Sequence, residues 1–244
     1  MSETTPVILP DQRRKYVRPI MRVLIRIALA LLTDLRIVGQ ENLPDRGPLL
    51  LVGNHFHFVD PLIFIRIAPW PIEFVGNAAM PNAPLSVRIF PKIWKTYEVE
   101  RARSSRSALI AAKDLLDRGG ILGIFPEAGS WAKVLRPARP GTALLALRTG
   151  TPLVPVGLYG LNDIFPALKK FKRARVTVSI GKQFGPYEGN ASGRADRELL
   201  EEVGHDIMRH IAPLIPPVSH GFYSDDPEIR SAAEEDSKYP WSIE

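Results

Sequence analysis

The stretch that decides the fold runs Leu49-Leu50-Leu51-Val52-Gly53-Asn54-His55-Phe56-His57-Phe58-Val59-Asp60-Pro61. Its first four residues form an unbroken apolar run, which is typical of a strand buried on both faces of a sheet. Polar residues follow at once, and Asp60-Pro61 then begins a second apolar segment. The stretch therefore predicts a strand, a polar loop and a helix, the unit from which parallel sheets are built.

Further strand-like and helix-like segments alternate along the rest of the chain. Strands are predicted at 35–39, 49–53, 72–76, 96–101, 121–125, 152–158 and 175–181. Helices are predicted at 61–68, 84–94, 104–118, 140–149, 161–170 and 194–212. This alternation predicts an α/β fold, in which helices cover a mainly parallel or mixed central sheet of about seven strands.

Composition limits the class of protein. The chain has 244 residues, of which 45% are hydrophobic and 24% are charged, as expected for one large globular domain or two small ones. The absence of cysteine excludes disulfides, cysteine-ligated metals and a cysteine nucleophile. The net charge is +6, although acidic residues outnumber basic ones in 217–244, so the rest of the chain is suited to anionic partners.

Residues 1–34 are predicted to form a leader and a membrane-interface helix. In the apolar segment 12–34, Arg18, Arg22 and Arg26 recur every fourth residue and so share one helical face, and Pro19 is expected to start or kink the helix. The segment is too short and too charged to span a bilayer, and it lacks the features of a signal peptide. Two alternatives remain: a helix lying on anionic lipid, or a core-packing helix with a solvated basic edge.

The predicted main domain covers residues 35–216, and an acidic C-terminal tail covers residues 217–244. Pro216-Pro217 separates the two, and seven of the tail's residues are acidic. We expect the tail to be peripheral or mobile.

His55 and Asp60 are the candidate catalytic pair. A carboxylate five residues after a histidine can hold one ring nitrogen as a donor, which leaves the other nitrogen free to accept a proton. Asp60 before Pro61 also fits an ordinary helix cap followed by proline at the first helical position. The two roles are compatible.

His57 adds a second interpretation of the same loop. His55, His57 and Asp60 form an H-x-H-x-x-D string that is similar to the H-x-H-x-D-H pattern of metallo-β-lactamases, but the Asp is one position late and the last His is missing. A metal-dependent hydrolase that uses these three residues is therefore kept as an alternative. The main prediction includes no metal and no cofactor.

The stretch from Leu35 to Asp60 closely resembles the start of the glycerolipid acyltransferases, whose best-known members are the 1-acylglycerol-3-phosphate acyltransferases. Their first block, H-x-x-x-x-D preceded by Asn, matches Asn54, His55 and Asp60. Later blocks follow in family order as Glu98-Val99-Glu100-Arg101, Phe125-Pro126-Glu127 and Val154-Pro155-Val156-Gly157. The resemblance covers roughly residues 35–185 of the chain.

Two departures from the family pattern concern the acceptor. The third block usually runs F-P-E-G-T-R-S, but here it runs Phe125-Pro126-Glu127-Ala128-Gly129-Ser130-Trp131 and lacks the Arg, a natural phosphate ligand. The first block often has Ser where His57 stands. Lys133, Arg136 and Arg139 are the candidates to replace the lost cation.

The resemblance implies an O-acyltransferase. His55 would take the proton of an acceptor hydroxyl as it attacks an acyl thioester, and Asp60 would orient the imidazole ring. Arg101 would bind the acceptor phosphate, Glu127 would hydrogen-bond the acceptor or shape the loop, and Gly129 would permit close backbone approach.

The same resemblance predicts the partners. The acyl donor would be acyl-CoA or acyl carrier protein, and the acceptor a lysophospholipid, most simply 1-acylglycerol-3-phosphate, in phospholipid biosynthesis. The protein would act at an anionic membrane surface on the cytoplasmic face, as a peripheral or monotopic protein. A different hydroxylated acceptor is the alternative, and a non-catalytic lipid- or nucleic-acid-binding module is a further one. We predict no nucleic-acid partner, because a basic strand face rich in aromatic residues is missing.

Overall fold

The fold is built on a central sheet, described here from a computed structural model that covers residues 12–76, 93–94, 97–98, 105–189 and 197–236. The strands are β1 (Thr33–Val38), β2 (Leu49–Gly53), β3 (Glu73–Gly76), β4 (Tyr97–Glu98), β5 (Ile121–Ile124), β6 (Leu153–Tyr159) and β7 (Ala174–Ile180). Their order is β1-β7-β6-β2-β5-β3-β4. Among these described strands, only β6 and β7 pair antiparallel, which confirms the predicted mixed, mainly parallel sheet.

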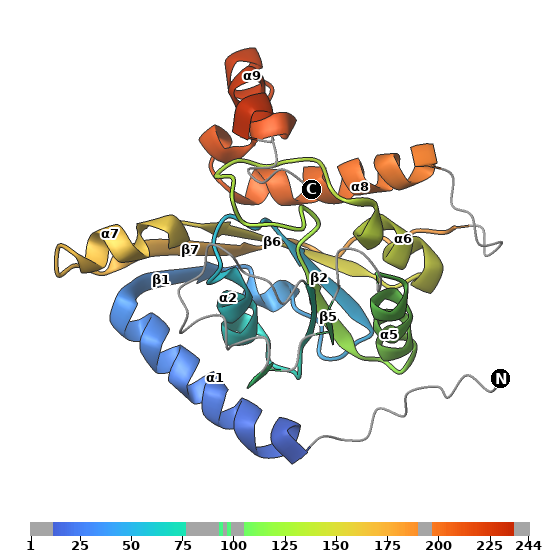
Figure 1. The fold of residues 1–244 in the computed structure, drawn as a ribbon, viewed down its shortest axis with the longest axis horizontal. Helices are drawn as coiled ribbons and strands as arrows, with labels where there is room; N and C mark the ends of the chain where they lie inside the picture. The colour runs from blue at the N-terminus through green and yellow to red at the C-terminus, as the bar shows by residue number, and fades with distance from the viewer. Residues whose placement is uncertain (1–11, 77–92, 95–96, 99–104, 190–196, 237–244) are drawn as a thin grey trace, which may run out of the picture.

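Helices cover both faces of this sheet (Figure 1). They are α1 (Gln12–Leu32), α2 (Asp60–Ile67), α5 (Ser105–Asp117), α6 (Pro140–Thr149), α7 (Ile164–Leu168), α8 (Arg197–Ile211) and α9 (Pro227–Asp236). Short 3₁₀ turns occur at Gln40–Asn42, Leu161–Asp163, Ala212–Leu214, Pro217–Ser219 and Gly221–Tyr223. The sheet and its two helical layers form the α/β architecture expected from the sequence.

Strand β2 shows why its sequence is continuously apolar. Leu49 and Leu51 belong to a hydrophobic cluster that includes α1 and α2, while Leu50 and Val52 belong to a second cluster that includes α5, α6 and α8. Alternate side chains of a strand point to opposite faces, and both faces are covered here. The strand therefore lies at the centre of the molecule, and the loop that follows it is held on a rigid support.

Helix α1 turns its basic edge inward, contrary to expectation. Arg18 is buried and makes a bidentate ion pair with Glu73 of β3, at 2.6 Å (Nη1–Oε1) and 2.8 Å (Nη2–Oε2). Arg22 donates to the carbonyl oxygen of Trp70, and only Arg26 of the three stays exposed. The buried Glu73 needs a cation, because an isolated buried carboxylate is costly. The prediction of a solvated or lipid-facing arginine row was therefore wrong for Arg18 and Arg22.

The exposed face of α1 is apolar instead. It carries Tyr16, Ile20, Val23, Leu24, Ile27 and Leu31, whose exposed fractions lie between 52% and 71%. The helix is continuous through Pro19, which neither starts nor breaks it. Among the described residues, no helix combines the length and apolar character needed to cross a membrane.

Other segments differ in smaller ways from the predicted elements. The predicted helix 161–170 is a 3₁₀ turn followed by the five-residue α7. The predicted helix 84–94 and strand 96–101 lie largely outside the described residues. The segment from Pro217 to Asp236, expected to be peripheral or mobile, is folded as far as it is described: the N–H of Leu135 donates to the carbonyl oxygen of Ser219, and the N–H of Phe222 donates to that of Leu135.

Candidate active site

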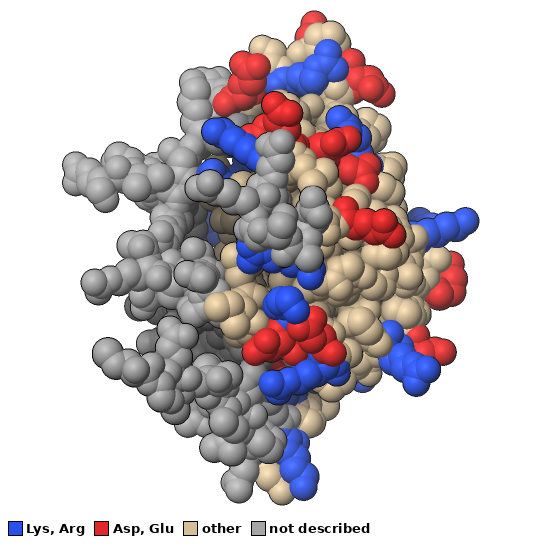
Figure 2. Space-filling model, turned by 90° about the vertical axis from the view of Figure 1, so that its right-hand side faces the viewer, with Lys and Arg blue, Asp and Glu red and all other residues tan. Residues whose placement is uncertain are grey.

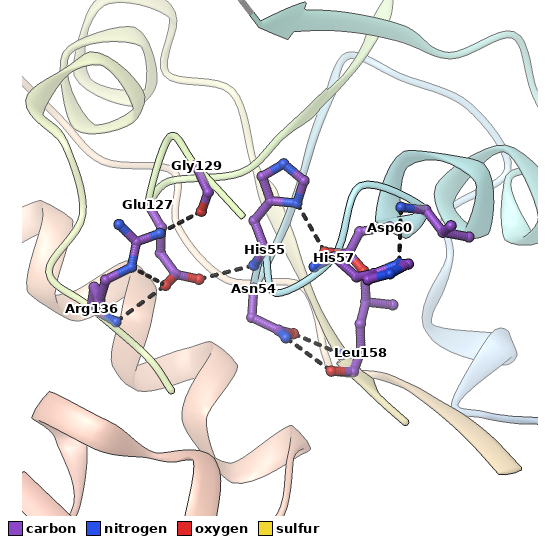
Figure 3. A network of polar contacts seen from close by, with 9 residues as sticks. Asn54, His55, His57, Asp60, Glu127, Gly129, Arg136 and Leu158 are labelled. Atoms are coloured by element: carbon purple, nitrogen blue, oxygen red, sulfur yellow. Dashed lines mark hydrogen bonds and ion pairs between the residues drawn. The ribbon is translucent and has the colours of Figure 1, made fainter. Parts of the chain in front are cut away.

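The predicted site residues meet where two neighbouring parallel strands end. β2 and β5 are hydrogen-bonded neighbours, so the loops after Gly53 and Ile124 leave the same edge of the sheet. The first loop carries His55, and the second carries Glu127 (Figure 3). Open α/β sheets place their chemistry at this edge.

His55 and Asp60 form a dyad across the first loop. The distance from His55 Nδ1 to Asp60 Oδ2 is 2.8 Å, and the same oxygen accepts the backbone N–H of His57 at 2.8 Å. Because a carboxylate can only accept, Nδ1 carries the proton and Nε2 is left as the basic nitrogen. Nε2 contacts no hydrogen-bonding group in the part of the chain that is described, so it is available to a substrate hydroxyl.

Asp60 does not cap α2. It is the first residue of the helix, which has no side-chain cap, and its carboxylate points back to the histidine loop. Asp60 is 1% exposed, and its Oδ1 has no hydrogen-bond partner among the described residues. Of the two roles considered for Asp60, the structure shows the one that orients His55. Its position at the helix start still favours the negative charge.

The imidazole of His55 is held by an aromatic stack. Its ring lies on Phe125, with 4.3 Å between ring centroids, and Phe125 lies on Phe64 at 4.8 Å. The side chain of His55 is 17% exposed, so the stack leaves part of the ring open. Phe125 thus fixes the plane of the ring, while Asp60 fixes its rotation.

Asn54 locks the end of β2 to β6. Its Nδ2 donates to the carbonyl oxygen of Leu158 at 2.9 Å, and its Oδ1 accepts the N–H of Leu158 at 2.7 Å. Asn54 is fully buried, so these bonds are shielded from water. In the sequence, Asn54 stands out only as part of the N-H-x-x-x-x-D motif. An apolar strand followed at once by Asn is the signal that predicts this structural role.

Glu127 links the loop after β2 to the loop after β5 through hydrogen bonds. Oε1 accepts the N–H of His55 at 2.9 Å, Oε2 accepts the N–H of Arg136 at 3.2 Å, and Arg136 Nε lies 3.4 Å from Oε2 (Figure 3). Burial raises the pKa of Glu127 to about 7, although Arg136 and the two N–H groups act in the opposite direction. Its carboxylate is enclosed by protein, so of the two roles predicted for Glu127 the structure displays the shaping of the loop.

Gly129 is required by its neighbours. A Cβ atom on Gly129 would lie 1.8 Å from Cζ3 of Trp131, and the carbonyl oxygen of Gly129 accepts a hydrogen bond from Arg136 Nη2. The guanidinium of Arg136 lies 3.8 Å from the centroid of the Trp131 ring. The loop after β5 is therefore folded around Arg136, which is 4% exposed. Of the three candidate cations, Lys133 and Arg139 are exposed, and Arg136 is committed to the loop.

Ala128 has a left-handed backbone, with φ of 56°, in the position where the related block usually has Gly. This conformation costs a residue with a Cβ atom about 1–2 kcal/mol, a cost that glycine does not have. Glycine in turn lowers the stability of the folded protein by about 0.4–1 kcal/mol, because it gives the unfolded chain more conformational freedom. Ala128 is exposed and loses no packing. We expect Ala128→Gly to raise the free energy of unfolding by about 0.5–1 kcal/mol, measured by denaturant titration. Ala28→Gly, at an exposed position inside α1, should instead lower it by about 1 kcal/mol. A loss of stability in Ala128→Gly would contradict the strain.

The predicted phosphate ligand Arg101 lies outside the described residues. The second block enters them only as β4, whose Tyr97 and Glu98 pair in parallel with Val75 and Gly76 of β3. The carboxyl end of β4 thus points to the same sheet edge as those of β2 and β5.

His57 faces away from the dyad. Its ring contacts Phe58, with 4.1 Å between centroids, and Phe165 of α7 at 5.9 Å. Burial lowers the pKa of His57, with Asp60 opposing and His55 adding to the shift. Among the residues that the structure describes, no three His, Asp or Glu side chains converge as a metal ion requires. The geometry thus pairs His55 with Asp60 and gives no support to a three-ligand site that includes His57.

Comparison with known proteins places this site in a family. Residues 34–159 match the family model described as Acyltransferase. The chain is 32% identical over 152 residues to 1-acyl-sn-glycerol-3-phosphate acyltransferase from Borreliella burgdorferi, covering 59% of each protein. It is 28% identical over 166 residues to the chloroplastic enzyme BAT2 of that name from Brassica napus, covering 66% of this chain and 47% of the relative. The chain thus spans less than two thirds of these relatives.

A solved structure has the same fold. The crystal structure of the 1-acyl-sn-glycerophosphate acyltransferase PlsC from Thermotoga maritima matches 96% of this chain and 86% of its own, with a TM-score of 0.58 and 21% identity. The match to the family model includes β1 to β6, and with them His55, Asp60, Glu127 and Asn54. Since that match covers more than half of the sequence, the chain belongs to the acyltransferase family.

Proposed function

We propose that this protein transfers a fatty-acyl group from an acyl thioester, acyl-CoA or acyl carrier protein, to the hydroxyl of 1-acylglycerol-3-phosphate in phospholipid biosynthesis. The observation that carries the proposal is the His55–Asp60 dyad, whose Nε2 has no partner among the described residues. The names of the Borreliella and Brassica relatives support the acceptor. Family membership favours acyl transfer over the metal-dependent hydrolase considered from the sequence.

In this proposal the chemistry needs only the dyad and the two substrates. Nε2 of His55 takes the proton of the acceptor hydroxyl while the oxygen attacks the thioester carbonyl carbon. The C–S bond then breaks, the ester forms, and the imidazolium returns its proton to the leaving thiolate. Asp60 stabilises the imidazolium through Nδ1–H. General-base catalysis of this kind typically contributes about 10²–10⁴-fold.

The test is a product assay with purified protein. Labelled acyl-CoA and acyl carrier protein are each offered with 1-acylglycerol-3-phosphate, other lysophospholipids and unphosphorylated alcohols. Formation of a diacylglycerol phosphate supports the proposal. Transfer to a different hydroxylated acceptor alone would keep the reaction and replace the substrate, which is the alternative raised by the missing arginine of the third block. Thioester hydrolysis without transfer would contradict the proposal.

Arg101 is the proposed ligand of the acceptor phosphate. Removing one partner of a buried charged hydrogen bond costs about 2–5 kcal/mol, so Arg101→Ala should lower kcat/KM for 1-acylglycerol-3-phosphate by about 30-fold or more. The KM for the acyl donor should change little, and Arg101→Lys should restore activity only in part, because an ammonium lacks the planar fork. Arg103→Ala is the matched control. Equal, weak effects on both substrates would remove Arg101 from the phosphate site.

We further propose that the protein acts at an anionic membrane surface on the cytoplasmic face, as a peripheral or monotopic protein, and that α1 is the contact. The support is the apolar face of α1, with Leu24, Ile27 and Leu31 more than half exposed. A long exposed apolar stripe beside basic residues is typical of an interfacial helix.

Replacing Leu24, Ile27 and Leu31 together by serine should weaken binding to anionic vesicles by about tenfold or more, because each loses apolar area that would enter the lipid. Ile110→Ser/Val218→Ser removes exposed apolar side chains elsewhere and is the control. Vesicle co-sedimentation gives the affinities, and turnover of short-chain soluble substrates should be unchanged in both variants. Unaltered binding by the α1 variant would return the helix to a purely structural role.

A further inference from the structure

The turn between α7 and β7 exposes a phenylalanine where the backbone favours glycine. Phe171 is 99% exposed and has a φ of 52°. Its N–H donates to the carbonyl oxygen of Leu168, and the N–H of Lys172 donates to that of Ala167. These two bonds define a helix-ending motif whose left-handed residue is usually glycine. Neither the burial nor the backbone of the folded chain explains a phenylalanine here.

The residues around Phe171 are basic. Lys169, Lys170, Lys172 and Arg173 are all exposed, and Leu168 is 50% exposed. Within the described ranges, no carboxylate forms an ion pair with Lys169, Lys170 or Lys172. An exposed aromatic side chain surrounded by lysine ammonium groups is complementary to a lipid bilayer, which has an apolar interior and anionic headgroups. We call residues 168–173 the basic turn.

The basic turn lies beside the C-terminal end of α1. Arg173 Nε donates to the carbonyl oxygen of Thr33 at 2.9 Å, and Ala174 pairs with Thr33 at the start of β7 and β1. Leu31, at the end of the apolar face of α1, is 71% exposed. In Figure 1 the tip of the turn lies just beyond this end of the helix, along the edge on which α1 runs. The basic turn is therefore a spatial neighbour of the C-terminal end of α1.

The side of the molecule that carries α5 and α6 differs in its charge pattern. Figure 2 shows the side on which α5 and α6 lie in Figure 1, and on its described part Lys and Arg are mixed with Asp and Glu. Such mixed charge is typical of a solvated surface.

We propose that the basic turn is a second membrane contact, in which Phe171 enters an anionic bilayer and the lysines bind its headgroups. This inference rests on the proposed action of the protein at a membrane. It adds to α1 a contact that lies close to the site, because Phe165 of α7 contacts His57 and α7 is only about 8 Å long. The turn thus brings the loop that carries the dyad toward the lipid.

The experiment uses the lack of cysteine in the chain. Phe171→Cys is labelled with an environment-sensitive fluorophore, and Ile110→Cys on α5, 55% exposed, is the matched control. With vesicles of phosphatidylcholine and phosphatidylglycerol, the label at 171 should brighten, shift to the blue and be quenched by lipids spin-labelled near the headgroup. The label at 110 should do none of these.

Phe171→Gly should weaken vesicle binding by about tenfold or more without loss of thermal stability, because glycine suits the backbone. Each Lys→Gln change should weaken it by up to about fivefold, and only with anionic lipid.

The outcomes separate this inference from the proposal on which it rests. If the full chain sediments with vesicles while the label at 171 remains in water, the basic turn is not a contact and α1 alone binds the membrane. If the chain does not bind vesicles at all, both membrane proposals fail, and acyl transfer to short-chain substrates in solution still tests the chemistry. A label that responds to single-stranded RNA and not to lipid would overturn the assignment in favour of a nucleic-acid surface.

Discussion

His55→Ala should abolish acyl transfer, with a loss in kcat of about 10²–10⁴-fold or more, because it removes the nitrogen placed to accept the hydroxyl proton. The fold should persist, because the bonds that hold the loop do not involve the imidazole. Asn54 binds the backbone of Leu158, and Glu127 accepts the backbone N–H of residue 55. His55→Gln keeps most of the side-chain volume over Phe125 and should be equally inactive. Steady-state turnover and the circular dichroism of each variant are the measurements.

His57→Ala is the matched control for that result. His57 lies two residues away and contacts Phe58 and Phe165, and its ring has no part in the dyad. We expect it to retain activity within about tenfold, since the backbone N–H that binds Asp60 remains. An inactive His57→Ala together with an active His55→Ala would show that the base has been assigned to the wrong histidine.

Asp60→Asn should lower kcat by about 10²–10⁴-fold while the protein stays folded. If the amide oxygen takes the place of Oδ2, the ring is still oriented but the imidazolium loses its negative partner. If the amide nitrogen takes that place, it faces Nδ1 and moves the ring proton to Nε2, where no base is left. Either orientation places an uncharged group where the reaction develops positive charge.

The stability of Asp60→Asn gives a separate readout. Oδ1 is buried without a hydrogen-bond partner among the described residues, so an amide N–H₂ placed there is an unsatisfied donor that costs about 1–3 kcal/mol. Asp163→Asn, at an exposed carboxylate, should change neither turnover nor stability by more than about 0.5 kcal/mol. Near-normal turnover in Asp60→Asn would leave Asp60 with a structural role only.

The sequence predicted the central strands and one helix well because their signals are local. β2 at 49–53 and α6 at 140–149 have the predicted bounds. A strand covered on both faces has no polar face to confuse its pattern, and Pro140 and Gly150 mark the two ends of α6. The spacing of His55 and Asp60 was informative for the same reason, since the loop between them is short enough to determine its own geometry.

The orientation of α1 could not be predicted in this way. A row of arginines is normally the solvated face of a helix, and here Arg18 is taken inward by Glu73, a residue 55 positions away in the chain. The role of Glu127 depended likewise on the N–H groups of His55 and Arg136, which no sequence pattern brings together. The folding of the segment after Pro217 could not be predicted for the same reason, because it hydrogen-bonds to Leu135, which is distant in sequence.

The ion pair between Arg18 and Glu73 has a mechanical consequence. It joins α1 to β3, and β3 is hydrogen-bonded to β5, which is the neighbour of β2, the strand whose following loop carries His55. The ion pair thus fixes the position of α1 relative to the sheet that carries the dyad. With α1 resting on a bilayer, the height of Nε2 above the lipid would be constant. The acceptor would then have to rise out of the membrane by a fixed distance, and the depth of its hydroxyl would decide whether it can react.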